Sequence, residues 1–245
     1  MTTRRRSLLL LTTDVGLSVF LIMIVVFIFV LTPLGRIGII GRFVIDIFFS
    51  LLLISGIASV SEHRGVFAAV TGIAVLALVF RWTDSFISLP ALQVLDYGAT
   101  IVSVLLFCMI ILARVFKKGP MTFHRIEGAM AVYLLLGLAW AYAYQLLAYL
   151  NPGAYSGAVT ASEGFSSWIY FSFVTLATLG YGDISPVHPV ARSLATAEAI
   201  TGQLYLAVLI ARLVSQELFY RQLRSEGGAD SPKGRDDDMP GPEAR

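Results

Sequence analysis

Long apolar runs, separated by short polar segments, most limit how this chain can fold. A helix needs roughly 20 mostly apolar residues to cross the hydrocarbon core of a bilayer. Runs near that length recur through the sequence, at about residues 15–34, 43–60, 66–80, 95–116, 126–150 and 190–219. We therefore predict an all-α membrane protein with six transmembrane helices, although the run at 66–80 is short and contains Gly72.

Composition excludes the main alternatives to a membrane protein. Charged residues make up 14% of the 245 residues and hydrophobic residues 57%, whereas soluble domains carry about 25% charged residues. A single cysteine cannot form a disulfide within the chain, and no cysteine–histidine cluster has the spacing of a zinc site. The net charge of +2 is too small to indicate nucleic-acid binding. A soluble core, a disulfide-rich secreted domain and a nucleic-acid-binding protein are therefore disfavoured.

Lysine and arginine in the loops predict the orientation of the chain, because cytoplasmic loops carry an excess of both. With the amino terminus inside, the inner segments hold ten such residues: Arg4, Arg5, Arg6, Arg64, Arg114, Lys117, Lys118, Arg125, Arg221 and Arg224. The outer segments hold four: Arg36, Arg42, Arg81 and Arg192. We therefore expect a multi-pass protein of the cell membrane with both termini in the cytoplasm.

A shorter apolar segment, at about residues 165–177, is helical in pattern but too short to cross the bilayer. It leads into the sequence Thr178-Leu179-Gly180-Tyr181-Gly182-Asp183, between the fifth and sixth runs. Non-helical backbone at membrane depth is tolerated only where protein buries it or water lines it. Alternate glycines can adopt positive φ, which lets successive carbonyl groups point the same way. Because carbonyl rings can replace the hydration shell of a monovalent cation, this segment is a candidate cation site.

This hexapeptide, preceded by a short helix and flanked by two spans, resembles the selectivity filter of the tetrameric potassium channel family. The resemblance covers about residues 126–219. It implies a homotetramer that conducts potassium passively around one axis, without catalytic residues or an organic cofactor. It also implies that Asp183 lies at the outer mouth and that Tyr181 braces the filter from behind. The implied ligands of the ion are the Thr178 hydroxyl and the carbonyl groups of Thr178, Leu179, Gly180 and Tyr181.

Two departures from the family pattern bear on the filter. Leu179 stands where valine is most common, which is a conservative change because the carbonyl group is the ligand. Tyr170 and Phe171 stand where many members have two tryptophans, so the usual aromatic collar around the filter is in doubt. Tyr170 could still offer its hydroxyl to Asp183, or it could simply pack.

The resemblance divides the chain into four parts. Residues 1–14 form a basic cytoplasmic segment, 15–118 a four-helix transmembrane domain, 119–224 the pore domain, and 225–245 a cytoplasmic tail that we expect to be disordered. We predict a potassium-selective channel that is not strongly voltage-gated. The alternatives are a non-selective or weakly selective cation channel, a pore-loop potassium transporter subunit, and a non-conducting membrane scaffold.

Three residues of the last span are further candidates for a role in conduction. Gly202 weakens the helix and matches the hinge glycine of the family's inner helices, although close helix packing explains a small residue equally well. Glu198 is ionisable inside the bilayer, and we favour a hydrogen bond behind the pore helix over an ionic role in the cavity. Gln203 lies on a different face, which is the candidate cavity lining.

The fourth run occupies the position of a voltage sensor but lacks the charges of one. In voltage-gated channels this span carries arginine or lysine at every third position, because gating charge must move through the field. Here Asp96 and Arg114 are its only charged residues. In the second run, Arg42 and Asp46 form an i,i+4 pair that could neutralise itself. Strong voltage sensing by the usual mechanism is therefore not expected.

The basic cluster at the end of the fourth run has a simpler interpretation. Arg114, Lys117 and Lys118 lie at the expected cytoplasmic surface. Basic side chains in that position are attracted to anionic lipid, at about 1 kcal/mol each. We expect these three residues to bind lipid headgroups and to begin the linker to the pore domain.

Overall fold

The structure is a computed structural model of the 245-residue chain. It describes residues 16–58, 64–86, 89–116, 122–157 and 164–229. The predicted basic segment at 1–14, Lys117, Lys118 and most of the predicted tail lie outside the described residues.

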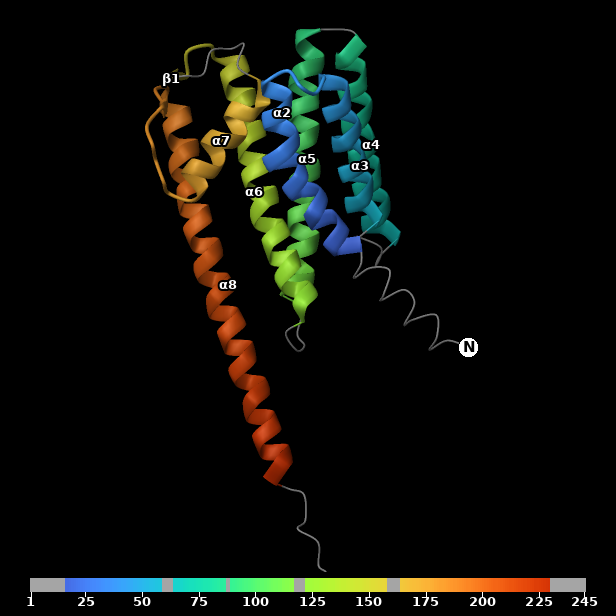
Figure 1. Ribbon diagram of the computed structural model, residues 1–245, viewed down its shortest axis with the longest axis vertical. Helices are drawn as coiled ribbons and strands as arrows, with labels where there is room; N and C mark the ends of the chain where they lie inside the picture. The colour runs from blue at the N-terminus through green and yellow to red at the C-terminus, as the bar shows by residue number, and fades with distance from the viewer. Residues whose placement is uncertain (1–15, 59–63, 87–88, 117–121, 158–163, 230–245) are drawn as a thin grey trace, which may run out of the picture.

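The described chain is almost entirely helical, which confirms the predicted fold class (Figure 1). The first helix covers Gly16–Arg36 and includes a π-helical turn, η1 (Phe27–Leu31), followed by α2 (Thr32–Arg36). The widened turn precedes Pro33, which has no N–H to donate to the turn before it. The other helices are α3 (Arg42–Ala58), α4 (Arg64–Phe86), α5 (Pro90–Val115), α6 (Phe123–Leu150), α7 (Phe165–Leu176) and α8 (Pro189–Ala229).

Among the described residues, four helices are long and apolar enough to cross a membrane: Gly16–Arg36, α5, α6 and the Pro189–Phe219 part of α8. Helix α3 has 17 residues, at the lower end of the range of about 17–25 that spanning requires. Within the described residues, α4 has a shorter apolar stretch, Val70–Thr83. Helix α4 packs against both α5 and α3 (Figure 1). That α3 and α4 also cross the bilayer, giving six spans in all, stays a prediction.

Two helices run further than the sequence predicts. Helix α4 continues to Phe86, since no proline or glycine interrupts it after the predicted end at about residue 80. Arg81, expected in an outer loop, therefore lies within a helix. Helix α8 continues to Ala229, five residues into the segment predicted to be a disordered tail beginning at residue 225.

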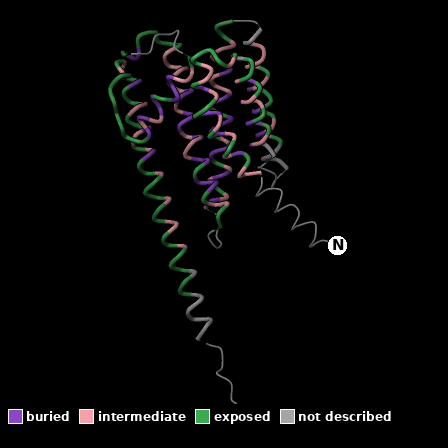
Figure 2. The backbone as a smooth tube through the Cα atoms, in the orientation of Figure 1, coloured by how far each residue is buried: buried purple, intermediate pink, exposed green. Residues whose placement is uncertain are grey.

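The helices pack as an up-and-down bundle, and α8 extends beyond it (Figure 1). Because only a short segment joins α5 to α6, these two helices are antiparallel neighbours. The core of the bundle is aromatic and aliphatic: the fully buried rings of Phe20 and Phe107 lie 6.2 Å apart, and Gly56 lets α3 approach both. In the most apolar stretch of α6, 56% of residues are buried, against 11% in α8 (Figure 2). Helix α8 therefore leaves most of its surface uncovered within one chain.

Candidate functional site

Helix α7 lies between α6 and α8 and is fixed there by aromatic packing (Figure 1). Trp168 and Phe171 of α7 are buried, and their ring centroids lie 4.9 and 5.7 Å from that of Tyr155 in β1 (Tyr155–Gly157). The ring of Phe171 also lies 4.8 Å from that of Tyr144 in α6. These rings form an aromatic cluster behind α7 that differs from the two-tryptophan pattern of the family.

Backbone hydrogen bonds join the first residues of the hexapeptide to the last turn of α7. The amide of Thr178 donates to the carbonyl of Thr175 (2.9 Å), and the amide of Leu179 donates to the carbonyl of Val174 (2.8 Å). The α7 carbonyl groups at this end therefore carry the negative end of the helix dipole toward the start of the hexapeptide.

The backbone of the hexapeptide alternates in handedness. Thr178, Gly180 and Gly182 have φ of 58°, 58° and 81°, while Leu179 and Tyr181 between them do not have positive φ. Thr178 is the one residue other than glycine with positive φ in the described part of the chain, a conformation that costs about 1–2 kcal/mol. Such alternation turns successive carbonyl groups toward one side. Strain of this kind persists at functional sites.

Two short strands hold the outer end of the hexapeptide. β1 pairs antiparallel with β2 (Ile184–Pro186), and Gly157 faces Ile184. Gly157 has φ of 108°, and a Cβ atom there would lie 1.9 Å from the carbonyl oxygen of Asp183. Only glycine therefore permits the backbone after the hexapeptide to approach β1 this closely. In addition, the Ser185 hydroxyl donates to the carbonyl of Gly182 (3.3 Å).

The aromatic side chain of the hexapeptide stacks on α7. The rings of Tyr170 and Tyr181 are nearly parallel, with centroids 6.5 Å apart. The structure thus shows the packing role of Tyr170, whereas a hydrogen bond from its hydroxyl to Asp183 stays a prediction. Residues 177–183 are nevertheless all exposed in the single chain.

Helix α8 contacts the inner end of the hexapeptide through two of the candidate residues. The Gln203 side-chain amide lies 3.5 Å from the Thr178 hydroxyl, at the limit of a hydrogen bond. At Gly202, an added Cβ atom would lie 2.3 Å from the carbonyl oxygen of Leu176, the last residue of α7. The structure thus places Gly202 at a close backbone approach, which is the packing interpretation; its role as a hinge stays a prediction.

Glu198 lies behind α7 and is completely buried. One carboxyl oxygen is 2.5 Å from the Ser172 hydroxyl, and the other accepts a hydrogen bond from the Tyr144 hydroxyl. The Ser172 hydroxyl is also 2.7 Å from the carbonyl oxygen of Gly137. One carboxyl group thus connects α6, α7 and α8.

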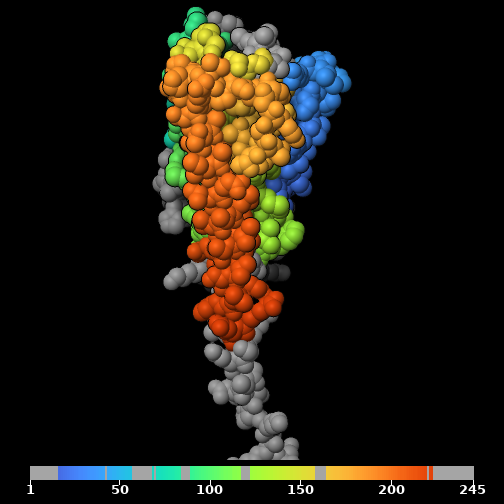
Figure 3. Space-filling model, turned by 90° about the vertical axis from the view of Figure 1, so that its left-hand side faces the viewer, coloured from blue at the N-terminus to red at the C-terminus, as the bar shows by residue number. Residues whose placement is uncertain are grey.

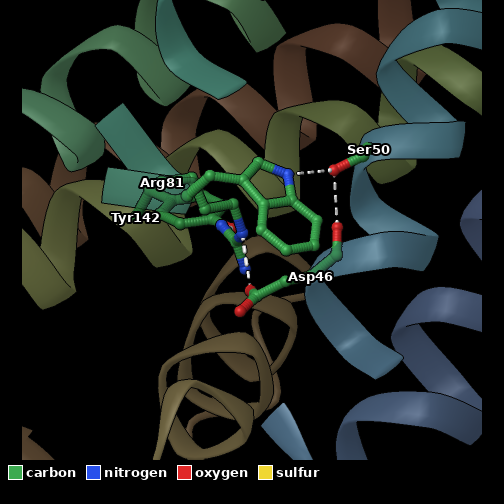
Figure 4. A network of polar contacts seen from close by, with 5 residues as sticks. Asp46, Ser50, Arg81 and Tyr142 are labelled. Atoms are coloured by element: carbon green, nitrogen blue, oxygen red, sulfur yellow. Dashed lines mark hydrogen bonds and ion pairs between the residues drawn. The ribbon is translucent and has the colours of Figure 1, made fainter. Parts of the chain in front are cut away.

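A second polar network joins α3 and α4 to α6 (Figure 4). Arg81 Nε donates to Asp46 Oδ1 at 2.7 Å, and the Arg81 guanidinium also donates to the Tyr142 hydroxyl at 3.0 Å. Asp46 thus pairs with Arg81 of α4, whereas the sequence suggests Arg42, whose side chain lies outside the described part. The Tyr142 ring lies 4.2 Å from that of Phe165, the first residue of α7.

A cavity of about 330 Å³ adjoins this network. Its lining includes Asp46, Arg81, Asp96, Gln145 and Phe165, so it lies beside the beginning of α7. Arg81 is hydrogen-bonded and ion-paired within this network.

Sequence reasoning missed three groups that support the hexapeptide. Tyr144 and Ser172 belong to no motif, and only tertiary packing brings them to Glu198. The β1–β2 pair is too short to show an alternating pattern. Arg212 of α8 was also missed: its guanidinium lies 4.9 Å from the Phe116 ring and donates to the Phe116 carbonyl at the end of α5. A lone arginine after a long apolar run was the available signal.

Comparison with known protein families finds a match that includes α7 and the hexapeptide. Residues 130–217 match the family model described as "Ion channel". The chain is 36% identical over 77 residues to "Inward rectifier potassium channel Kirbac3.1" of Paramagnetospirillum magnetotacticum, a match covering 31% of this chain and 24% of the relative. It is 37% identical over 82 residues to "Two pore potassium channel c" of Oryza sativa subsp. japonica, covering 30% of this chain and 18% of the relative.

The ion-channel match covers the segment that contains α7, the hexapeptide and most of α8, and the two relatives support the resemblance to the potassium channel family. The matching family is one of channels rather than enzymes. The chain spans about a quarter or less of the length of the curated relatives it matches. No solved structure matches the chain.

Proposed function

We propose that this protein is a potassium-selective channel that carries passive K⁺ flux across the cell membrane. The observation that carries the proposal is the alternating backbone of Thr178, Gly180 and Gly182, directly after a half-length helix. The names of both matched relatives, which are potassium channels, support the same ion.

Potassium is bound, in this proposal, by the carbonyl groups of residues 178–181 together with the Thr178 hydroxyl. These oxygens replace the water that the ion loses on entry. The negative end of the α7 dipole favours a cation below them, and Asp183 adds negative charge at the outer mouth. Ions at neighbouring sites repel one another, so conduction does not require any site to bind weakly by itself.

Four copies of the chain are needed around one axis, because a single loop cannot surround an ion. Cyclic symmetry is the usual arrangement of such oligomers. Figure 3 shows α8 and α7 together on one face of the chain, without other described elements over them. The exposed apolar surface of α8 and the hexapeptide includes Leu179, Ile200, Leu204, Val208, Ile210 and Val214. Contact with other copies would cover part of it and would enclose the exposed hexapeptide.

The arrangement of helices supports the predicted orientation, with both termini in the cytoplasm. The first helix begins, and α8 ends, at the same side of the bundle in Figure 1. Arg114 lies in the last turn of α5 at this side, where it would bind anionic lipid together with Lys117 and Lys118. Weak voltage dependence follows because the charged residues of α5 are limited to Asp96 and Arg114.

Flux through purified full-length protein in liposomes tests this function. With a K⁺ gradient and a potential-sensitive dye, we expect the K⁺ gradient to generate a membrane potential. That potential should be unchanged when Na⁺ is the cation that balances K⁺ on the opposite side. Cross-linking in the same liposomes should give a tetramer as the largest species. Equal responses to Na⁺ and K⁺ gradients would favour the weakly selective channel. A tetramer that shows no ion flux under any condition would favour the membrane scaffold. Flux that requires a second, co-transported ion would instead indicate a transporter subunit.

A further inference from the structure

The hydrogen-bond network behind α7 contains more acceptors than its hydroxyl protons can serve. The Ser172 oxygen is 2.5 Å from Glu198 Oε1 and 2.7 Å from the Gly137 carbonyl oxygen. A serine hydroxyl carries one proton, while a peptide carbonyl and an ionised carboxylate are acceptors only. Ser172 can therefore donate to one of these two oxygens but not to both.

The Gly137 carbonyl can only accept, whereas a carboxyl group can carry a proton and donate it, so we assign the Ser172 proton to the Gly137 carbonyl. The contact between Ser172 and Glu198 then needs a proton from Glu198. A protonated carboxyl group has one O–H donor and keeps its second oxygen as an acceptor. Every contact is satisfied if Glu198 donates to Ser172, Ser172 donates to Gly137, and Tyr144 donates to the second oxygen of Glu198.

The surroundings of Glu198 also disfavour a charge. Glu198, Ser172 and Tyr144 are each fully buried at membrane depth. The titratable groups that face Glu198 are three tyrosines, Tyr133 and Tyr144 of α6 and Tyr155 of β1. Among the described residues, the ion pairs found do not include Glu198. An unpaired carboxylate here would cost several kcal/mol of desolvation.

We propose that Glu198 is a neutral carboxylic acid whose proton holds α7 between α6 and α8, and that it is thereby a positioning residue for the hexapeptide. This inference rests on the proposed function, because α7 ends directly before the ion-binding backbone. Removal of the proton would leave two acceptors facing one hydroxyl and a buried charge. Conduction should therefore be present at neutral pH and be lost as pH rises.

Glu198→Gln tests the proposal most sharply, because glutamine reproduces the neutral acid. Its amide N–H can donate to Ser172, and its carbonyl can accept from Tyr144. In liposomes we expect E198Q to keep K⁺ flux within about twofold of the natural protein and to abolish the loss of flux at alkaline pH. Glu198→Ala leaves the Ser172 and Tyr144 hydroxyls without their partner, so flux should fall roughly tenfold or more.

Glu217→Gln is the matched control, since Glu217 is an exposed glutamate of the same helix, paired with Arg221. E217Q should leave both the flux and its pH profile unchanged. The infrared difference spectrum between the natural protein and E198Q should contain the carbonyl stretch of a protonated carboxylic acid at neutral pH. That spectrum is independent of conduction, so it tests the proton even if the protein conducts no ions.

An ionised Glu198 would give the opposite results. The infrared band would be absent at neutral pH, and E198Q would lower flux as far as E198A does. Either result would overturn the proposal. If the natural protein shows the infrared band but no K⁺ flux, the proposed function is overturned. The assignment of Glu198 as a neutral acid would still be supported.

Discussion

Replacing Gly202 with alanine is expected to abolish selective potassium flux while the chain still inserts into the membrane. The added Cβ atom would lie 2.3 Å from the carbonyl oxygen of Leu176. That oxygen belongs to the backbone at the end of α7, so it cannot yield as a flexible side chain would. Either α8 or α7 must shift, and the hexapeptide begins two residues after Leu176. Liposome flux with K⁺ and with Na⁺ measures the loss.

Gly98→Ala is the control for this experiment. Gly98 is also a helical glycine, but a Cβ atom there meets nothing within 4 Å. Alanine should be neutral at this position or should stabilise α5 by up to about 1 kcal/mol. Normal selectivity with an altered open probability in G202A would support the hinge interpretation instead. Unchanged selectivity and unchanged gating would contradict both interpretations.

Replacing Gly180 with alanine is expected to remove discrimination between K⁺ and Na⁺. Gly180 has φ of 58°, but a Cβ atom there would meet nothing within 4 Å, so the effect comes from the backbone and not from a clash. The left-handed conformation costs an alanine about 1–2 kcal/mol, and a tetramer would bear this cost in all four copies. The carbonyl groups should then leave the orientation that binds K⁺. The ratio of K⁺ to Na⁺ flux is the measurement.

Gly164→Ala is the matched control for Gly180→Ala. Gly164 precedes α7 with φ of −50°, and a Cβ atom there also meets nothing within 4 Å. Alanine adopts this φ without strain, so the flux ratio should remain that of the natural protein. Equal selectivity in G180A and the natural protein would show that the alternating backbone is not what binds the ion.

Much of this architecture could be predicted from the sequence, because apolar length and glycine spacing are local properties. The short helix is expected at about 165–177 and is found at Phe165–Leu176. The glycines at positions 180 and 182 have the positive φ that their spacing suggests. That Thr178 shares this conformation is not expected from the sequence, since a β-branched residue rarely adopts it.

The rest depends on contacts between residues far apart in the chain. Tyr144 reaches Glu198 across 54 positions and Ser172 reaches it across 26, so neither pair leaves a pattern in the sequence. Helical spacing suggests Arg42, whose side chain lies outside the described part, as a partner of Asp46, but it does not reveal that Arg81 of the next helix also pairs with Asp46. Helical spacing can identify ion pairs only within one helix, whereas packing in a bundle also brings together charged residues of neighbouring helices.

The reversal potential of the current through the purified full-length protein tests the central claim most directly. A planar bilayer would separate a high-K⁺ solution from a high-Na⁺ solution of the same ionic strength, with residual K⁺ on the second side. If the carbonyl groups of residues 178–181 select potassium, the current should reverse near the K⁺ equilibrium potential. Reversal near zero would contradict the account, because it would mean that Na⁺ passes as readily as K⁺.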